Sequence, residues 1–315
     1  MKILIFGEVL WDVYPDKKVI GGAPLNFAGH TTHLGDEAVL VSAVGDDTLG
    51  KETLAAVKAL NINDAMIATV PFPTGVCNVT IDQNGVPSYD LCRGVAYDNI
   101  PVTNRQIEDI REGGYDALYF GSLAQRDGAQ WDGAQRDGAQ RDGTSRETLK
   151  RILQEFEQRC VIFDVNIRQS YYTKEVLSDG LNACTILKFS REESGVFERL
   201  GLANVTGNDA DCLRALCRDL AFRYDIGTVL LTLDKDGAMV FDRAADAFTL
   251  SERPTGRVIS TVGAGDSFSA GYLHFALRGR PVKDCLERAV HISNYVVQHL
   301  ESVPVYSQEL LEKLA

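Results

Sequence analysis

Hydrophobic residues fall into short, nearly continuous runs that alternate with stretches of helical spacing. The first run, at 2–6, ends at Gly7, and similar runs recur along the chain. Such runs are typical of parallel strands, because helices cover both faces of a parallel sheet. They predict strands at 2–6, 38–44, 117–120, 161–165, 185–189 and 228–233, followed by a β pair at 238–241 and 248–251.

The stretches between these runs predict helices. Pro24 stands where a first helical turn tolerates proline, and Gly35 stands where a helix can close. The predicted helices cover 25–34, 47–60, 103–111, 145–159, 174–181, a segment from about 192, and then 209–223, 264–278, 282–298 and 307–314. The alternation indicates an α/β fold in which helices flank a mostly parallel central sheet.

Between 74 and 91 the pattern changes to that of β structure. Two β-rich runs flank Asn84 and Gly85, the strongest short signal for a hairpin turn. A hairpin inside an α/β chain predicts an excursion from the main sheet, such as a lid.

One segment, 125–143, breaks the alternation with the tandem pentapeptide QRDGA QWDGA QRDGA QRDG. A period of five matches neither a helix nor a strand, so no face can become continuously apolar. We expect a mobile, solvated, low-complexity loop, because an interaction repeat needs units of ~20 residues or more. The chain as a whole, 1–315, is predicted to form a single domain.

The composition narrows the class of protein. The 315 residues are 45% hydrophobic and 24% charged, and the net charge is −12. Nucleic acids and anionic membranes need a basic face, so this balance argues against both as partners. The seven cysteines form no CxxC pair, and the apolar start MKILIFGEVLW is too short for a signal peptide. No stretch approaches the ~20 apolar residues that cross a bilayer. We therefore expect a soluble, cytoplasmic protein with reduced cysteines.

The stretch 257–273, RVISTVGAGDSFSAGYL, carries the clearest candidate chemistry. It predicts a short strand that ends at Val262, a turn of small residues at 263–265, and a helix. Free backbone N–H groups and the positive end of the helix dipole suit a phosphate there. Asp266 opens the helix, and two interpretations stay open. It is either a helix cap worth about 1 kcal/mol, or a general base that takes a proton from a hydroxyl as that hydroxyl attacks a phosphoryl group.

Two familiar phosphate-binding motifs are matched only in part. GDDTLGK at 45–51 has P-loop spacing, but Glu52 stands where the metal-binding hydroxyl belongs. GAGDSF at 263–268 lacks the third glycine of a dinucleotide fingerprint, because Phe268 occupies that position. Neither motif supports a nucleotide site of its own type.

Two long signatures match a known family. GGAPLNFA at 21–28, followed by Gly35 and Gly45, and STVGAGDSF at 260–268 resemble the ribokinase-like (PfkB) family of carbohydrate kinases. The shorter pieces that agree are GEVLWD at 7–12, RGVAYD at 93–98, FGSL at 120–123, DVNIR at 164–168 and TLDKDGA at 232–238. Among members, the chain looks most similar to fructokinases. The resemblance implies a three-layer α/β fold with a small β-sheet lid, built from about 8–22 and 74–98.

The same resemblance implies roles for individual residues. The expected catalytic groups are Asp266 as base, Gly263, Ala264 and Gly265 as the anion hole, and Arg168 near the phosphates. The expected sugar contacts are Asp12, Gly22, Asn26 and Arg93. The expected nucleotide contacts are Thr232, Gly237 and Lys188, and the expected metal contacts are Glu193 through water, Asp164 and Asn166. Taken singly, Asp12 and Asn26 are better explained as local caps, whereas together, at the family spacing, they favour the sugar site. The alternative for each arginine is a surface ion pair worth under ~1 kcal/mol, and for Arg93 this alternative is supported as well as the sugar contact.

Four places depart from the family pattern. Ser260 replaces an Asp, and Glu301-Ser302 replaces Gly-Ala, where many members help coordinate a monovalent cation. These two departures weigh against activation by K⁺. Ser190 replaces the Asn of an Asn-x-x-Glu motif, and Asp234 replaces a glycine of the nucleotide loop.

The leading hypothesis is an ATP- and Mg²⁺-dependent kinase that phosphorylates a hydroxymethyl hydroxyl of a small sugar, with D-fructose as first choice. The alternatives are a kinase for another sugar, a keto-sugar acid or a nucleoside, and a non-catalytic family member that senses sugar or nucleotide. The exposed edges of the lid also predict pairing with a second lid in a homodimer.

Overall fold

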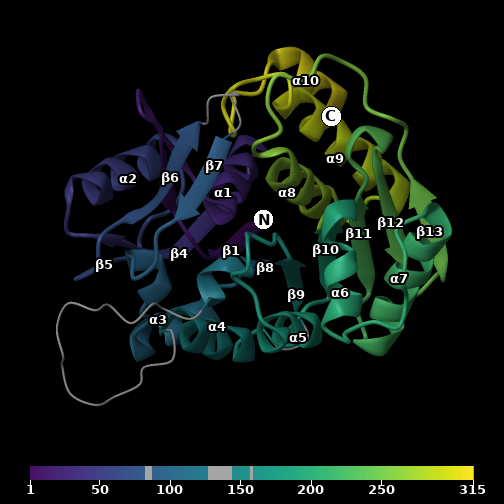
Figure 1. Cartoon of the computed structure of the whole chain (residues 1–315), viewed down its shortest axis with the longest axis horizontal. Coiled ribbons are helices and arrows are strands. Elements are labelled where there is room, and N and C mark those ends of the chain that lie inside the picture. The colour runs from purple at the N-terminus through teal and green to yellow at the C-terminus, as the bar shows by residue number, and fades with distance from the viewer. Residues whose placement is uncertain (82–86, 127–143, 157–158, 315) are drawn as a thin grey trace.

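A nine-stranded sheet runs through the middle of the molecule (Figure 1). The computed structural model describes residues 1–81, 87–126, 144–156 and 159–314. The strand order is β13-β12-β11-β10-β9-β8-β1-β4-β5, and only β12 and β13, at one edge, pair antiparallel. The strands are β1 (Lys2–Phe6), β4 (Glu37–Gly45), β5 (Ile67–Val70), β8 (Ala117–Gly121), β9 (Cys160–Asp164), β10 (Ile186–Ser190), β11 (Thr228–Thr232), β12 (Ala238–Asp242) and β13 (Ala247–Leu250). The predicted mostly parallel sheet is confirmed.

Helices cover both faces of this sheet. They are α1 (Ala23–His33), α2 (Thr48–Ala59), α3 (Asn104–Glu112), α4 (Thr144–Gln154), α5 (Lys174–Ala183), α6 (Gly195–Arg199), α7 (Ala210–Arg223), α8 (Ala264–Ala276), α9 (Val282–Val296) and α10 (Gln308–Leu314). Apolar residues of α3 to α7 join the core on one face, whereas those of α1, α2 and α8 to α10 join the core on the other. The fold is therefore three-layered, as predicted. Within the described residues, no helix is both long enough and apolar enough to cross a bilayer.

A second, four-stranded sheet lies apart from the first. Its order is β3-β2-β6-β7, with β2 and β6 parallel at the centre. The strands are β2 (Leu10–Val13), β3 (Lys18–Gly21), β6 (Gly75–Ile81) and β7 (Pro87–Leu91). They lie within the two segments expected to form a small β-sheet. The expected turn at Asn84 and Gly85 lies outside the described residues.

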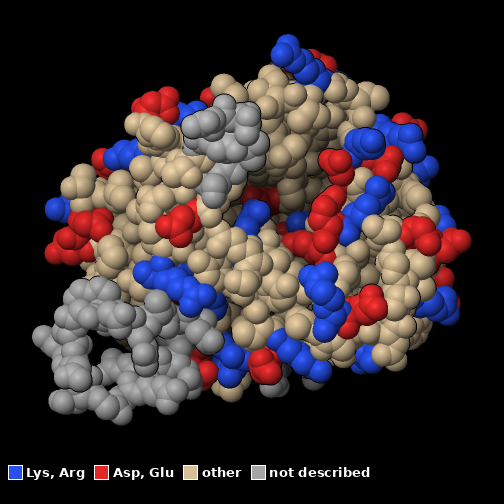
Figure 2. Space-filling model, viewed as in Figure 1, with Lys and Arg blue, Asp and Glu red and all other residues tan. Residues whose placement is uncertain are grey.

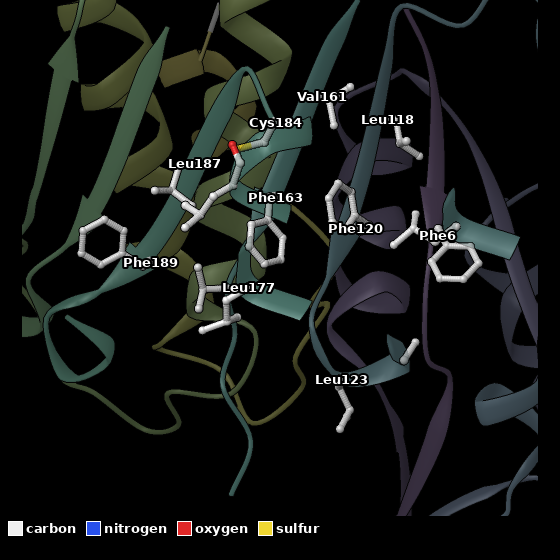
Figure 3. Packing of buried hydrophobic residues seen from close by; sticks show 14 of the residues in the cluster. Phe6, Leu118, Phe120, Leu123, Val161, Phe163, Leu177, Cys184, Leu187 and Phe189 are labelled. Carbon is white, nitrogen blue, oxygen red and sulfur yellow. The ribbon is translucent and has the colours of Figure 1, made fainter. Parts of the chain in front are cut away.

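A row of large apolar side chains crosses the main sheet (Figure 3). Phe6 of β1 lies opposite Phe120 of β8, Phe120 opposite Phe163 of β9, and Phe163 opposite Leu187 of β10. The rings of Phe120 and Phe163 stack with their centroids 5.0 Å apart. All four side chains are fully buried. Because neighbouring strands contribute to one continuous row, their carboxyl ends are held in register beside one another.

The predicted strand ending at Val262 is wrong. The amides of Ile259 and Ser260 both donate to the carbonyl oxygen of Val297, at 2.7 and 3.2 Å, instead of to a neighbouring strand. Val262 is 54% exposed. An apolar run forms a strand only when it can pair with the edge of a sheet. In the described structure the edge strands of the main sheet are β13 and β5, and the segment ending at Val262 pairs with neither. The glycine turn at 263–265 therefore follows a loop.

The pentapeptide segment begins inside the fold. Gln125 and Arg126 are each only 3% exposed. Arg126 makes two hydrogen bonds to the carboxylate of Asp98, from Nε at 2.7 Å and from Nη2 at 3.1 Å. Arg126 also lies over the ring of Tyr97, 4.9 Å from its centroid. The ordered core thus extends two residues into the predicted loop, and the rest of that loop, 127–143, lies outside the described residues.

The Arg126 and Asp98 pair makes a testable prediction about stability. Replacing either residue by alanine leaves a buried, unpaired charge, and we expect the free energy of unfolding to fall by about 3–5 kcal/mol. The exposed pair of Arg105 and Asp109, 2.9 Å apart, is the matched control, and its loss should cost under about 1 kcal/mol. Urea titration of both double-mutant cycles measures the two coupling energies. Equal coupling energies would contradict a structural role for Arg126.

Candidate active site

The carboxyl ends of the parallel strands meet the N-termini of α1 and α8. Strand β1 lies between β4 and β8. The strands β4 and β5 that come next in the main sheet lie on one side of β1, and the later strands β8 to β13 lie on its other side. Such a switch in strand order opens a crevice at the carboxyl edge of a sheet. Figure 2 shows a hollow near the middle of this face, with acidic and basic side chains in it and on its rim.

Two residues far apart in the sequence meet at this edge. Nδ2 of Asn26, in the first turns of α1, donates to Oδ2 of Asp266, in the first turn of α8, at 2.8 Å. Asp266 is 9% exposed and Asn26 is 5% exposed. Neither side chain caps its own helix, because the caps are Gly22 and Gly263, without side-chain hydrogen bonds. The capping interpretations of Asp266 and Asn26 are therefore not supported.

The environment of Asp266 sets its basicity. Burial raises the pKa of Asp266, because a charge in a dry site is poorly solvated. The hydrogen bond from Asn26 and the positive charges of Lys188 and Arg168 oppose that rise. A carboxylate whose pKa is raised is a stronger base once ionised, so Asp266 is suited to accept a proton from a hydroxyl.

Three small residues, 263–265, form the turn in front of Asp266. Gly263 has a φ of 81°, and a Cβ there would lie 2.3 Å from the carbonyl oxygen of Ser302. Only glycine combines that backbone conformation with that close approach. The amide of Ala264 donates to the carbonyl oxygen of Thr261 at 3.3 Å, so the turn presents the amides of Gly263 and Gly265 at the start of a helix of 13 residues. This arrangement attracts anions.

A buried ion pair lies directly behind this turn. Nζ of Lys188 is 3.0 Å from Oδ1 of Asp164, and both side chains are at least 92% buried. The same Nζ would lie 2.9 Å from a Cβ at Gly265. Burial alone would lower the pKa of Lys188, but the carboxylates of Asp164, Glu193 and Asp266 outweigh it and hold the pKa above its usual value. Lys188 is therefore a cation fixed beside the anion-attracting turn.

Glu193 holds together two backbone segments. Its Oε1 accepts from the amide of Ile167 and its Oε2 from the amide of Ser190, both at 2.7 Å. Asn166, next to Ile167, has a φ of 38°.

Burial raises the pKa of Asp164 to about 6, against the charge of Lys188. Within the described residues, no cluster of three or more His, Cys, Asp or Glu side chains could hold a metal ion.

The expected nucleotide contacts lie one strand further along. Thr232 ends β11 directly opposite Ser190 of β10. Gly237 begins the turn into β12 after a short 3₁₀ helix, Asp234–Asp236. Asp234 has a φ of 56°, a left-handed conformation that explains why family members usually carry glycine there. Asp236 pairs with Arg191 at 3.0 Å, so its charge is compensated.

Two of the expected sugar contacts belong to the small sheet and to its junction with α1. Asp12 is on β2, opposite Cys77 of β6, and Gly22 precedes α1. Burial raises the pKa of Asp12, against its hydrogen bond with Cys77 and the charge of Arg168. A Cβ at Gly22, whose φ is 111°, would lie 2.5 Å from the carbonyl oxygen of Glu8. The charge of Arg168 also opposes the rise in the pKa values of Asp266 and Glu8. This one exposed arginine therefore acts on three carboxyl groups, those of Asp12, Asp266 and Glu8.

Arg93 is placed differently from the other candidates. It is exposed, and its guanidinium lies over the ring of Tyr171, 4.8 Å from the centroid. Tyr171 also donates to the carbonyl oxygen of Leu91 of β7, at 3.2 Å. Arg93 thus borders the small sheet without a direct contact to Asp266 or Asp12 among the described hydrogen bonds and ion pairs.

Sequence reasoning missed Glu8. This residue follows β1, is 2% exposed, and has an Oε2 atom without a hydrogen-bond partner in the described structure. Burial raises the pKa of Glu8 to about 7, although the amides of Glu8 and Ala23 and the charge of Arg168 oppose the rise. The sequence signal was the acid directly after a buried strand, in GEVLWD, but only the tertiary contacts place it beside Asp266.

Comparison with known proteins relates the whole arrangement to one family. The sequence model described as "pfkB family carbohydrate kinase" matches residues 4–109 and 120–306. A fructokinase from Rhizobium leguminosarum bv. trifolii is 26% identical over 287 residues, covering 86% of this chain and 78% of its own.

Two solved structures have the same fold. A 2-dehydro-3-deoxygluconokinase from Thermotoga maritima superposes with a TM-score of 0.80 at 20% identity, covering 100% of this chain and 99% of its own. A fructokinase from Vibrio cholerae O395, in a form with fructose, ADP and calcium ion bound, superposes with a TM-score of 0.76 at 18% identity, covering 99% and 98%.

The buried carboxyl of Glu8 predicts a pH dependence of stability. Its pKa rises from 4.5 to about 7 on folding, so the folded state holds a proton that the unfolded state releases. Stability is then fully present below pH 4.5 and falls as the pH rises through 7, by up to ~3 kcal/mol. In Glu8→Gln the loss of stability should be smaller by this amount, and the part that comes from the raised pKa values of Asp164 and Asp266 should remain. The measurement is urea unfolding of both proteins from pH 4.5 to 8, and parallel pH profiles would contradict a buried, titrating Glu8.

Proposed function

Because the chain belongs to the pfkB family of carbohydrate kinases, we propose that it transfers the γ-phosphate of ATP to a hydroxymethyl hydroxyl of a small sugar, with D-fructose as first choice. The observation that carries this proposal is the pairing of Asp266 with Asn26 beside the turn 263–265 and the cation of Lys188. A base and an anion-binding turn on adjacent positions of one helix are what phosphoryl transfer to a hydroxyl requires.

Asp266 acts as the base in this proposal. Its carboxylate takes the proton of the sugar hydroxyl as that oxygen forms a bond to the γ-phosphorus. The bond from the γ-phosphorus to the bridging oxygen breaks, and ADP leaves with the electron pair. Asn26 keeps Oδ2 of Asp266 oriented, and Oδ1 remains to receive the proton. Burial of Asp266 supports this role because it strengthens the ionised form as a base.

The turn and Lys188 act on the phosphoryl group. Negative charge gathers on the equatorial oxygens of the transferring group, and the N–H groups of 263–265 and the helix dipole of α8 oppose it. Lys188 adds a full positive charge that needs no rearrangement, because Asp164 already fixes it at 3.0 Å. Arg168, which is exposed in the loop after β9, is the residue proposed to approach the phosphates.

The donor set fits a divalent cation that arrives with the nucleotide. Mg²⁺ keeps several waters and is bound by one or two carboxylates plus phosphate oxygens, without an all-protein cage. Each oxygen of Glu193 accepts one amide hydrogen bond and retains a lone pair for a water molecule. Glu193, with Asp164 and Asn166 nearby, would hold such waters. Bound Mg²⁺ would supply charge neutralisation on the phosphate oxygens.

The small sheet is proposed to cover the sugar. Asp12 lies on β2 of this sheet, and Gly22 follows β3 and precedes α1, the helix that carries Asn26. Two hydrogen bonds tie β7 to the loop after β9: Gln169 donates to the carbonyl oxygen of Tyr89 at 2.6 Å, and Tyr171 to that of Leu91. The loop that carries Arg168 is therefore joined both to the small sheet, at Gln169 and Tyr171, and to the main sheet, through Glu193. Closure would exclude water, which otherwise hydrolyses ATP.

The choice of sugar rests on relatives. The similarity to a fructokinase over 86% of the chain favours D-fructose, whereas the fold match to a 2-dehydro-3-deoxygluconokinase keeps a keto-sugar acid as the alternative. Asp12 and Asn26 suit hydroxyl groups in both cases, because a carboxylate accepts from two hydroxyls and an amide both donates and accepts.

The substrate prediction is tested by release of ADP. With Mg²⁺ and ATP we expect turnover with fructose above that with ribose, other hexoses, keto-sugar acids and nucleosides, measured by a coupled assay. We expect the rate to be independent of K⁺, because Ser260 and Glu301 stand at the cation positions. Turnover on a keto-sugar acid instead would overturn the choice of sugar. Absence of turnover on every compound, with sugar binding still detected by thermal shift, would favour a sensor.

The catalytic prediction concerns Asp266. Asp266→Asn keeps the size of the side chain and removes the base, so kcat should fall by ~10²–10⁴-fold while sugar binding persists. Single-turnover kinetics and calorimetric titration with the sugar measure the two quantities. Glu309→Gln, at an exposed residue of α10, is the control and should leave kcat unchanged. An unchanged kcat in Asp266→Asn would rule out Asp266 as the base.

A further inference from the structure

We propose that Ser302 is a positioning residue for Asp266, acting through Asn26. The inference rests on the proposed function, because it assumes that Asp266 is the base. It concerns a turn near the C-terminus, 301–303, that the sequence marked only as a departure from the family pattern.

A continuous path of hydrogen bonds joins the two residues. Oγ of Ser302 donates to Oδ1 of Asn26 at 2.9 Å, and Nδ2 of Asn26 donates to Oδ2 of Asp266 at 2.8 Å. The side-chain amide of Asn26 has an oxygen that accepts hydrogen bonds and an NH₂ group that donates them. In the observed orientation both groups have a partner, whereas a flipped amide would place its oxygen against a carboxylate oxygen of Asp266. Ser302 thereby helps to hold the N–H end of Asn26 toward Asp266.

The backbone of Ser302 is itself held on two sides. Its carbonyl oxygen is 2.9 Å from Nε2 of His30, and Nδ1 of His30 is 2.8 Å from the hydroxyl of Tyr306. Burial lowers the pKa of His30 to about 3, so the ring is neutral. Because a carbonyl only accepts, Nε2 of His30 carries the proton and Nδ1 accepts from Tyr306. On the other side, the carbonyl of Ser302 lies against Gly263.

This placement joins three separate parts of the chain at the proposed site. Asn26 comes from α1, Asp266 from α8, and Ser302 from the segment between α9 and α10. The neighbouring Val303 packs on α1, where its Cγ1 would lie 2.8 Å from a Cβ at Gly29.

The chemistry of Asp266 follows from the contact. The hydrogen bond from Asn26 favours the ionised form of Asp266 and so lowers its pKa. An Asn26 amide that is no longer held would give a weaker bond, and Asp266 would keep its proton to a higher pH. The other groups whose charges act with that of Asp266 are Lys188, Arg168, Glu8, Asp164 and Tyr119. None of them touches Ser302 through a described hydrogen bond, so a change at Ser302 leaves their contribution in place.

The test compares Ser302→Ala with Ser302→Thr. In Ser302→Ala we expect kcat/KM to fall ~5-fold and the acid limb of its pH profile to move up by about 0.5 unit, as loss of one hydrogen bond to a charged network predicts. Ser302→Thr keeps the hydroxyl and should restore both quantities. Tyr224→Phe is the structural control. It removes the hydrogen bond from the hydroxyl of Tyr224 to the carbonyl oxygen of Leu202, 3.1 Å long and on the other face of the main sheet, so it should lower thermal stability but leave the acid limb in place.

A direct readout separates this proposal from the proposed function. Carbon-13 NMR titration of the aspartate carboxyl groups, with Asp266→Asn to assign the signal, measures the pKa of Asp266 without turnover. An upward shift in Ser302→Ala alone supports the positioning role even if no sugar is phosphorylated. A pKa of Asp266 in Ser302→Ala equal to that of the wild type, an equal shift in Tyr224→Phe, or failure of Ser302→Thr to restore the pKa would overturn the proposal.

Discussion

The proposed active site depends on keeping the carboxylate of Asp266 ionised in a buried place beside a turn that attracts anions. Burial works against the charge of Asp266, and two further buried carboxyl groups, Glu8 and Asp164, add to the cost. Three groups favour the ionised form of Asp266: the buried cation Lys188, the exposed cation Arg168 and the amide of Asn26. Since charges interact more strongly away from water, each of these few groups has a large effect on the basicity of Asp266.

The parallel sheet is what brings those groups together. Glu8 follows β1, Asp164 ends β9 and Lys188 lies within β10, so strands on one side of the switch in strand order supply them all at the same edge. The row from Phe6 to Leu187 locks these strands in register from one face. On the other face α1 and α8 pack side by side, and Phe27 stacks on Tyr119 with centroids 3.9 Å apart. A buried ion pair is favourable only when its two charges are held at a fixed, short distance. The two close-packed cores hold the strands that carry Lys188 and Asp164 in such fixed positions.

The nucleotide side is organised by backbone hydrogen bonds. Glu193 joins the loop after β9 to the end of β10, and Asp236 is compensated by Arg191. A metal bound mainly by phosphates and water suits this arrangement, because the protein then needs only one or two oriented carboxylates. In the proposed function this arrangement would separate two tasks, with α1 and α8 acting on the sugar hydroxyl and the ends of β10 and β11 binding the nucleotide.

Local patterns in the sequence were enough for the alternation of strands and helices, the small sheet, and the glycine turn with Asp266, because buried runs and left-handed turns constrain residue type at each position. They failed where burial depends on distant partners. The apolar run ending at Val262 was predicted to be a strand, but it has no neighbouring strand to pair with. Arg126 was predicted to lie in a solvated loop, but it forms a buried ion pair with Asp98. Glu8 and Ser302 gained their importance only from neighbours far along the chain. The sequence by itself determined the fold class and the residue types available for the reaction. Only the tertiary structure decided which carboxyl groups share one dry site and which side chains orient them, because burial and hydrogen bonding between distant segments are properties of the folded chain.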